Sequence, residues 1–300
     1  MGIFKQALSM ILNEHKYRPI KGKYLSIGKQ TVTIPADLIF DLFKYYSIPG
    51  EQLKLFYADP ANIDISTRRG KGFIFDHSLL SAFSSCEYNC LDVSEYEGAT
   101  ILHDMNTIIP KEHYNTYDFI YDGGCMDNMF DPVTFLKNAS NMLKLGGRIV
   151  HVECASAYAG AYLSFSPEWF FSYYAINNYL DCKVYAIVAR ESSGNPHVFN
   201  SDLFLWSPYF TRTEDYDYIK GCQSLNGQMF LLVIAEKQAN STSDVIPMQS
   251  HYLQPTDIDW RNRYEDFCNV RRPLLKTNLL KDNIELPLLT DHFQYLGSDF

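Results

Sequence analysis

The strongest constraint on the fold is an alternation of short apolar runs with helical segments along the first half of the chain. The apolar runs span residues 23–28, 87–93, 100–104, 117–122 and 148–153. Runs of this length bounded by turn residues are typical of buried strands. Strands that alternate with helices form a mostly parallel sheet with helices on both faces. The sequence therefore predicts an α/β fold, and the later apolar runs 183–189 and 229–235 are expected to be its last strands.

Start and stop signals define the helices and loops between these strands. Pro35 opens an apolar stripe that is typical of a helix. Asp131 is the expected N-cap of a second helix that runs to Leu143, and the Gly146-Gly147 pair is expected to end it. Residues 51–72 are polar and irregular, so they predict a loop.

The ends of the chain are expected to be additions to one large domain. Within residues 1–20, apolar side chains recur at helical spacing, which predicts an N-terminal helix. Residues 21–237 are expected to form the sheet domain. Residues 238–300 are polar at first and then aromatic, and we expect them to be an extension that wraps the domain.

Composition and charge exclude several classes of function. The chain has 26 Lys and Arg against 35 Asp and Glu, a formal net charge of −9, whereas binding to nucleic acid needs clustered cations. No apolar run is long enough to span a bilayer, and a signal peptide is not expected. The seven scattered cysteines favour a reduced, cytoplasmic protein. No second pair accompanies Cys86 and Cys90 at a zinc-binding spacing, so no metal site is expected.

Three motifs in the middle of the chain occur in a characteristic order. Residues 117–124 read Tyr-Asp-Phe-Ile-Tyr-Asp-Gly-Gly, residues 130–132 read Phe-Asp-Pro, and residues 143–148 read Leu-Lys-Leu-Gly-Gly-Arg. This order resembles the second half of class I S-adenosylmethionine-dependent methyltransferases. The segments 91–99 and 103–106 resemble a subgroup of these enzymes, several of which accompany glycan or natural-product biosynthesis. The resemblance implies a Rossmann-like methyltransferase fold and S-adenosylmethionine as the cofactor.

The resemblance assigns cofactor-binding roles to residues at the ends of two predicted strands. Asp92, followed by Val93, would accept hydrogen bonds from the ribose hydroxyls, and Asp104 would bind the adenine amino group with Met105 beside the ring. Both aspartates also suit a simple turn, so both interpretations stay open. Ligands of open α/β sheets do bind beyond the carboxyl ends of strands, where Asp92 lies.

Two glycine-containing turns are expected at the methionine end of the cofactor. Asp122, Gly123 and Gly124 lie where the family's chain passes that end, and paired glycines permit a close approach of the backbone. The family usually has Gly-x-Gly-x-Gly after its first strand. Here the turn is Gly28-Lys29-Gln30, so only the first glycine is kept.

The predicted catalytic and acceptor-binding residues follow the same strand ends. His151 and Glu153 alternate on one strand and therefore share a face. Together with Asp127 they are the candidate general bases, although a histidine in a buried strand is also a common core residue. Relatives carry an acidic residue followed by His in the 127–128 loop, whereas this chain has Asp127-Asn128.

Aromatic residues downstream of this strand are expected to line the acceptor cleft. They flank a Phe-Ser-Pro-Glu segment that resembles the subgroup, and they are Tyr158, Tyr162, Phe165 and Trp169. The expected substrate is a small polar molecule, such as a sugar or a glycan precursor, methylated on oxygen or nitrogen. The sequence does not indicate an oligomeric state.

Two other functions compete with methyl transfer. A nicotinamide-dependent oxidoreductase would need Gly-x-Gly-x-x-Gly for the pyrophosphate, which the chain lacks, and the Tyr216-x-x-x-Lys220 pattern lies far from such a turn. A methyltransferase fold that has lost its catalysis and acts as a binding partner or scaffold stays open, because a fold alone does not establish an activity.

Overall fold

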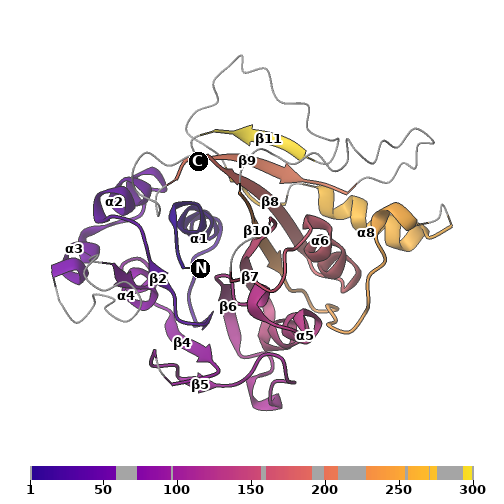
Figure 1. The fold of residues 1–300 in the computed structure, drawn as a ribbon, viewed down its shortest axis with the longest axis horizontal. Coiled ribbons are helices and arrows are strands. Elements are labelled where there is room, and N and C mark those ends of the chain that lie inside the picture. Colours follow the sequence, from indigo (N-terminus) through magenta and orange to yellow (C-terminus); the bar gives the residue numbers. More distant parts are fainter. Residues whose placement is uncertain are drawn as a thin grey trace.

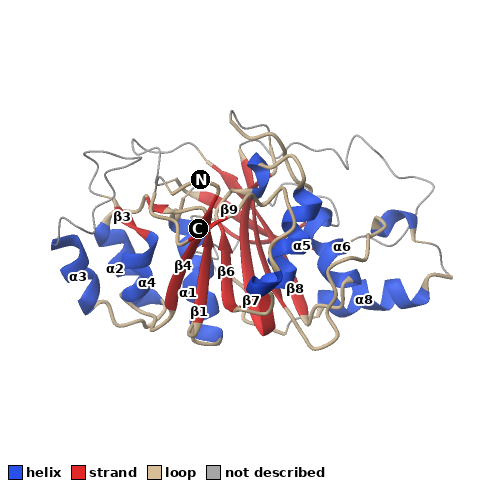
Figure 2. Ribbon diagram, turned by 90° about the horizontal axis from the view of Figure 1, so that it is seen from below, coloured by secondary structure: helices blue, strands red, loops and turns tan. Residues whose placement is uncertain are grey.

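The protein is built around one central sheet with helices on both sides (Figures 1 and 2). The computed structural model describes residues 2–58, 73–95, 97–156, 160–190, 199–208, 228–253, 256–269, 271–275 and 293–298. Within these residues the sheet has nine strands, in the order β11 (Phe293–Gly297), β9 (Ser201–Trp206), β8 (Asp181–Ala189), β10 (Met229–Glu236), β7 (Leu143–Cys154), β6 (Tyr117–Asp122), β1 (Lys23–Ile27), β4 (Glu87–Asp92) and β5 (Ile101–Leu102). A separate antiparallel pair consists of β2 (Thr31–Val32) and β3 (Ile74–Phe75).

The strand directions identify a doubly wound sheet. The run from β5 through β4, β1 and β6 to β7 is parallel throughout, and its order equals the first five positions of the dinucleotide-binding fold. Before the sixth position, which β8 takes, the antiparallel strand β10 is inserted. The predicted Rossmann-like α/β fold is therefore confirmed.

Two hydrophobic cores cover the two faces of the sheet. On one face lie α1 (Lys5–Tyr17), α2 (Ala36–Tyr45), α3 (Glu51–Ala58) and α4 (Asp76–Ser81). On the other lie α5 (Pro132–Met142), α6 (Pro167–Ile176) and α8 (Ile258–Cys268). Because side chains alternate along a strand, Val150 and Val152 of β7 enter the first core, whereas Ile149 enters the second. His151 and Glu153 therefore point toward the second core.

Two expectations about local structure were wrong. The helix α5 ends at Met142, before the Gly146-Gly147 pair, because Leu143 is already extended and begins the twelve-residue strand β7. The carbonyls of Asn141 and Met142, the last two residues of α5, accept hydrogen bonds from backbone N–H groups just before β6. Residues 51–58 form the helix α3, whereas the rest of the expected loop, residues 59–72, lies outside the described residues.

Strands β9 and β11 were not expected at all. They extend the sheet beyond β8, and β11 comes from the predicted C-terminal extension. The extension also contributes α8, whose Tyr264 and Phe267 are buried in the second core. The expected N-cap of α5 is confirmed, since Asp131 accepts a hydrogen bond from the backbone N–H of Thr134 at 2.9 Å. No helix of the described residues combines the length and apolar character needed to cross a bilayer.

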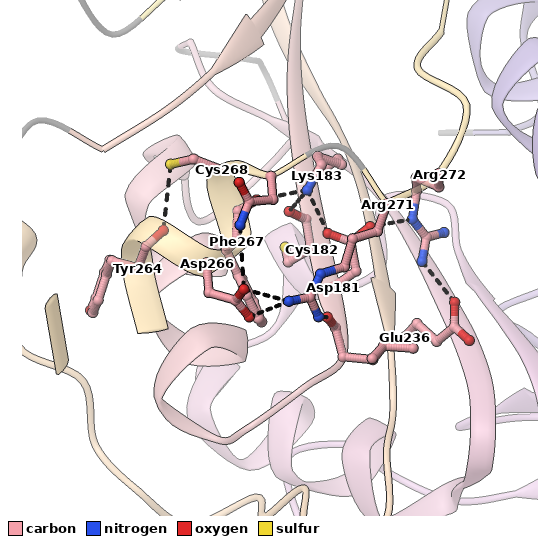
Figure 3. Close-up of polar contacts among 12 residues, drawn as sticks. Asp181, Cys182, Lys183, Glu236, Tyr264, Asp266, Phe267, Cys268, Arg271 and Arg272 are labelled. Atoms are coloured by element: carbon pink, nitrogen blue, oxygen red, sulfur yellow. Dashed lines mark hydrogen bonds and ion pairs between the residues drawn. The ribbon is translucent and has the colours of Figure 1, made fainter. Parts of the chain in front are cut away.

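A network of buried ion pairs fastens α1 to the sheet at the edge where β7 and β8 begin. The Arg272 guanidinium contacts carboxylates from three elements, at 2.7 Å from Asp181 of β8, 2.8 Å from Glu14 of α1 and 2.9 Å from Glu236 of β10. Figure 3 shows Arg272 between Asp181 and Glu236. Arg148 of β7 adds a second cation, 3.0 Å from Glu14. All five side chains are almost fully buried, so each charge depends on its partners.

Loss of the Arg272 side chain is expected to destabilise the fold strongly. Arg272→Ala leaves buried carboxylates without a partner and should lower the free energy of unfolding by about 3–5 kcal/mol. The neighbouring Arg271 provides a matched control, because its ion pair with Asp266 is partly exposed. Arg271→Ala should cost about 1 kcal/mol or less. Urea denaturation of both variants measures the difference, and equal losses would contradict a structural role for the Arg272 network.

Candidate functional site

The order of the strands reverses at the carboxyl edge of the sheet, the place where open α/β folds have a ligand-binding crevice. β1 lies between β4 and β6, and Ile27, its last residue, is in register with Leu91 on one side and Asp122 on the other. The chain passes from β1 to β4 in one direction and from β6 to β7 in the other. Ligands of open α/β sheets bind beyond the carboxyl ends of strands at such a reversal. The predicted site residues Gly28, Asp92 and Asp122 all lie at this edge.

Asp92 ends β4 with its carboxylate directed toward the turn after β1. Its Oδ1 accepts the backbone N–H of Ser94 at 3.2 Å. Its Oδ2 lies 4.0 Å from the position that a Cβ on Gly28 would take. The side chain is half-buried, and no described residue donates a hydrogen bond to Oδ2, so a ligand hydroxyl can reach it. Val93, the next residue, is 71% exposed.

The turn after β5 places Asp104 on the surface and Met105 in the core. The Oδ1 of Asp104 accepts two hydrogen bonds from Asn106, which lower the pKa of the carboxyl. Met105 is buried in the second core and does not present its side chain to the crevice. The Oδ1 of Asn106 also accepts the backbone N–H groups of Phe130 and Asp131, at 3.0 and 3.1 Å. This turn is therefore fastened to the loop after β6.

The turn after β1 is filled by its own side chains. The carboxamide nitrogen of Gln30 donates to the carbonyls of Ile27 and Gly28, each at 3.1 Å, and the residue is only 4% exposed. A Cβ on Gly123 would lie 2.3 Å from the Gln30 Oε1, and a Cβ on Gly28 would lie 2.7 Å from the Cys125 Sγ. Both glycines are therefore needed to make room for neighbouring side chains of the protein.

A buried carboxylate that the sequence analysis missed holds the same turn. Asp76, the first residue of α4, accepts hydrogen bonds from Ser26 and Tyr88 at 2.9 to 3.0 Å and a longer one from the backbone N–H of Gln30. Burial raises the pKa of the Asp76 carboxyl to about 6. The other predicted residue of the turn, Lys29, places its ammonium 4.1 Å from the centre of the Phe75 ring. These contacts attach the turn to α4 and β3.

His151 lies beneath the crevice with both ring nitrogens occupied. Its Nδ1 is 2.8 Å from the Oδ2 of Asp122, and its Nε2 is 2.6 Å from the hydroxyl of Tyr174 in α6. The other carboxylate oxygen of Asp122 accepts the backbone N–H of Cys125 at 3.0 Å. His151 and Asp122 are fully buried, so the predicted base has no route to a substrate in this arrangement.

Glu153 and Asp127 complete this buried polar cluster. Burial raises the pKa of Glu153 well above its usual range, and the contact with Asp122 raises it further, so the protonated acid is favoured. The Oε2 of Glu153 accepts the backbone N–H of Asp127 at 3.0 Å. The carbonyl of Asp127 in turn accepts the N–H groups of Tyr162 and Leu163. The cluster thus joins the loop after β6 to the loop after β7.

The donor atoms of Asp122, His151 and Glu153 lie within 4.8 Å of one another, which is compatible with a metal ion. Asp122 and His151 are hydrogen-bonded to each other, whereas the Oε1 of Glu153 is buried without a hydrogen-bond partner among the described residues. The Nδ1 of His151 and the Oδ2 of Asp122 face each other at hydrogen-bond distance, and a metal would have to replace that proton.

Aromatic side chains border the crevice beside the loop after β6. The rings of Phe130 and Tyr162 meet edge to face with centres 5.1 Å apart, and they are 83% and 69% exposed. Phe165 is buried in the second core, with its ring centre 5.9 Å from that of the half-buried Trp169. Tyr158 lies outside the described residues. Phe130 was not predicted, and its only signal in the sequence is a large apolar residue directly before the helix cap Asp131.

A hollow lies at the opposite edge of the sheet and contains none of the predicted site residues. It has a volume of about 330 Å³, and its lining includes Asn115, Asn141 and Lys237. The ammonium of Lys237 is held by the carbonyls of Ser140 and Leu143, at 2.7 and 2.8 Å. Its charge therefore stabilises the end of α5.

Comparison with known proteins gives matches to solved structures only. No model of a known family matches the chain, and no curated protein matches it. An S-adenosylmethionine-dependent methyltransferase from Archaeoglobus fulgidus is 11% identical, with 78% of this chain and 94% of that one covered at a TM-score of 0.38. The 1,6-didemethyltoxoflavin-N1-methyltransferase of Burkholderia thailandensis, solved with S-adenosylhomocysteine, is 13% identical, with 78% of each chain covered at a TM-score of 0.37. Likeness at this level assigns neither an activity nor a ligand.

Removal of the Asp76 charge is expected to change the pH dependence of stability. A carboxyl whose pKa is raised on folding contributes stability below its unfolded pKa and loses it as the pH rises through the folded value, here from about 4 to about 6. The stability of Asp76→Asn relative to the wild type should therefore increase by about 3 kcal/mol between about pH 4 and pH 7. Urea denaturation across this range tests it, and parallel curves for the two proteins would contradict it.

Proposed function

We propose that this chain is an S-adenosylmethionine-dependent methyltransferase that acts on a small polar acceptor. The observation that carries the proposal is the Asp92 carboxylate, which faces the Gly28 turn at the point where the sheet reverses direction. A carboxylate in this place can accept hydrogen bonds from both hydroxyls of a ribose. The chain lacks the glycine-rich turn that a pyrophosphate needs, so a nucleoside cofactor without phosphates fits better than a dinucleotide.

The residues at this edge fit the nucleoside half of the cofactor. Asp92 would hold the ribose, the exposed side chain of Val93 offers an apolar contact for the adenine ring, and Asp104 stands on the surface nearby with an available oxygen. Met105 would support this turn from inside the core. The methionine half would pass Gly28 and the Asp122-Gly123-Gly124 turn, where Gln30 now lies. When bound, the cofactor supplies an electrophilic methyl group on a sulfonium.

The buried polar cluster acts in this proposal by positioning the loops above it. Asp122 and Glu153 hold the backbone N–H groups of Cys125 and Asp127, and His151 holds Asp122. The role of general base that was expected for His151, Glu153 or Asp127 is replaced by this structural one, since all three side chains are buried. Methyl transfer depends mainly on alignment of the acceptor with the methyl group, which rigid loops provide.

The aromatic pair Phe130 and Tyr162 is the proposed acceptor platform. Exposed aromatic rings are costly in water and are suited to stacking on a sugar or another flat ring. The backbone of Tyr162 is bound to Asp127, and that of Phe130 to Asn106, so the pair is fixed to the loops that border the cofactor. Phe165 and Trp169 pack against each other a few residues further along the chain. A sugar or a glycan precursor is the acceptor class that best suits this platform.

One observation favours a second candidate function, that of a noncatalytic binding partner. The side chains of Gln30 and Cys125 fill the space beside Gly28 and Gly123, where the methionine half of the cofactor would lie. If this packing is permanent, the chain keeps the fold without the reaction. Calorimetry with S-adenosylmethionine distinguishes the two functions, because the noncatalytic candidate predicts no binding.

Loss of the Asp92 carboxylate should weaken cofactor binding. Asp92→Ala removes charged hydrogen bonds to the ribose and should reduce the free energy of binding of S-adenosylmethionine by about 1–3 kcal/mol. Asp131→Ala is the control, because it removes a helix cap and should cost about 1 kcal/mol of stability without changing the affinity. Calorimetry and urea denaturation give both quantities. Unchanged affinity in a folded Asp92→Ala protein would refute the ribose role.

Loss of either exposed ring should affect the acceptor and not the cofactor. With an acceptor found by screening sugar precursors against methyl-labelled S-adenosylmethionine, Phe130→Ala and Tyr162→Ala should each raise the acceptor KM by about five- to tenfold. The KM for the cofactor should stay unchanged. Leu145→Ala is the control, since Leu145 is equally exposed at the opposite edge of the sheet. An effect on the cofactor KM instead would place the pair outside the acceptor site.

A further inference from the structure

We infer that the Gln30 side chain competes with the amino-acid half of the cofactor, so that S-adenosylmethionine binds in full only after Gln30 has moved. The inference rests on the proposed function and concerns the control of that same site. The crevice then has a nucleoside half that is open to a ligand and an amino-acid half that the Gln30 side chain occupies.

The backbone carbonyls at the end of β1 already accept hydrogen bonds from side chains of the protein. The carbonyls of Ile27 and Gly28 are acceptors at the edge where the crevice opens, and an ammonium group on a ligand would donate to such acceptors. The carboxamide nitrogen of Gln30 already donates to both, at 3.1 Å each. The Cys125 thiol also donates to the Ile27 carbonyl, with its Sγ 3.0 Å from the carbonyl oxygen. The ligand and Gln30 would therefore use the same hydrogen-bond partners.

The turn after β6 lies close against the other side of the Gln30 carboxamide. A Cβ on Gly123 would lie 2.3 Å from the Oε1 and 2.6 Å from the Cδ of Gln30, far inside van der Waals contact. The carboxamide is thus held between the end of β1 and the turn after β6. These are the two turns between which the amino-acid half of the cofactor must lie.

Among the described residues, none occupies the nucleoside half in this way. The Oδ2 of Asp92 receives no hydrogen bond from a described residue, and the Val93 side chain is largely exposed. A nucleoside can therefore bind to this half without displacing Gln30. Binding of the amino-acid half therefore requires Gln30 to move, whereas binding of the nucleoside half does not.

The backbone around Gln30 allows its side chain to move without a change in the turn. Gly28, two residues before Gln30, has a φ of +69°, and its N–H donates to the carbonyl of Leu91. The backbone N–H of Gln30 faces the Asp76 carboxylate. Thr31 then begins β2. The turn is fixed on both sides, whereas the Gln30 side chain has three rotatable bonds. Its movement breaks two hydrogen bonds, which the ligand ammonium can form again.

Two ligands that differ only in the amino-acid half provide the test. S-adenosylhomocysteine carries that half, and 5′-methylthioadenosine lacks it. In the wild type, competition with Gln30 should keep the affinities for the two ligands close. In Gln30→Ala the affinity for S-adenosylhomocysteine should rise by about tenfold, the size of the hydrogen-bond competition that is removed. The affinity for 5′-methylthioadenosine should change by less than about twofold, because nothing is displaced when it binds.

Isothermal calorimetry on the full chain measures all four affinities without any need for turnover. Gln30→Asn is a second variant, because its shorter carboxamide cannot reach both carbonyls, and it should show the same selective gain. Gln6→Ala is the matched control. Gln6 is also a buried glutamine that donates to a backbone carbonyl, that of Phe199, but it lies in α1. It should leave the ratio of the two affinities unchanged.

The outcomes separate this inference from the proposed function. A selective gain for S-adenosylhomocysteine in the Gln30 variants supports competition. An unchanged or weaker affinity for it, with 5′-methylthioadenosine still bound, overturns competition and leaves the cofactor assignment standing. If neither ligand binds to any of the proteins, the proposed function fails and the inference fails with it.

Discussion

The buried guanidinium of Arg272 is the contact on which the arrangement of the whole sheet depends. It binds carboxylates from α1, β8 and β10, and Arg148 of β7 shares Glu14 with it. Lys183 extends the network, since its ammonium contacts Asp181 and the carbonyl of Phe267 in α8 (Figure 3). A buried charge is tolerated only with its partners in place. The network therefore sets how α1, α8 and the antiparallel strand β10 are joined.

A second buried polar cluster performs a related task near the opposite edge, beneath the candidate site. Here Asp122, His151 and Tyr174 form one chain of hydrogen bonds, and burial beside Asp122 raises the pKa of Glu153 so that its protonated form is favoured. The proton on Glu153 avoids two adjacent buried carboxylates, which would repel each other. This cluster holds the loops after β6 and β7 from below. The first network fixes the sheet, and the second fixes the loops that the sheet presents.

The crevice between these loops shows that glycines can serve the protein's own packing. In the resemblance to methyltransferases, Gly28 and Gly123 suggest a close approach of the cofactor. In the structure, the same positions admit the side chains of Cys125 and Gln30. Both uses follow from the missing Cβ. In the proposed function, the same glycines would serve the cofactor only after Gln30 has moved.

The sequence by itself determined the local elements and the edge at which a ligand would bind. Apolar runs of strand length predicted β1, β4, β6, β8 and β10, and the order Asp131-Pro132 predicted the start of α5, because these features depend on neighbours in the chain. The placement of Asp92 at a strand end came from the same local pattern.

Only the tertiary structure decided which side chains meet. Arg272 binds Glu14 across 258 residues of sequence, His151 finds Tyr174 on another helix, and Gln30 lies against Gly123. These contacts depend on how the helices pack on the sheet, which the spacing of residues in the sequence does not reveal. The same reason explains the residues that were missed, Asp76 and Phe130. The burial of the Asp76 carboxyl and the exposure of the Phe130 ring beside Tyr162 are both determined by packing.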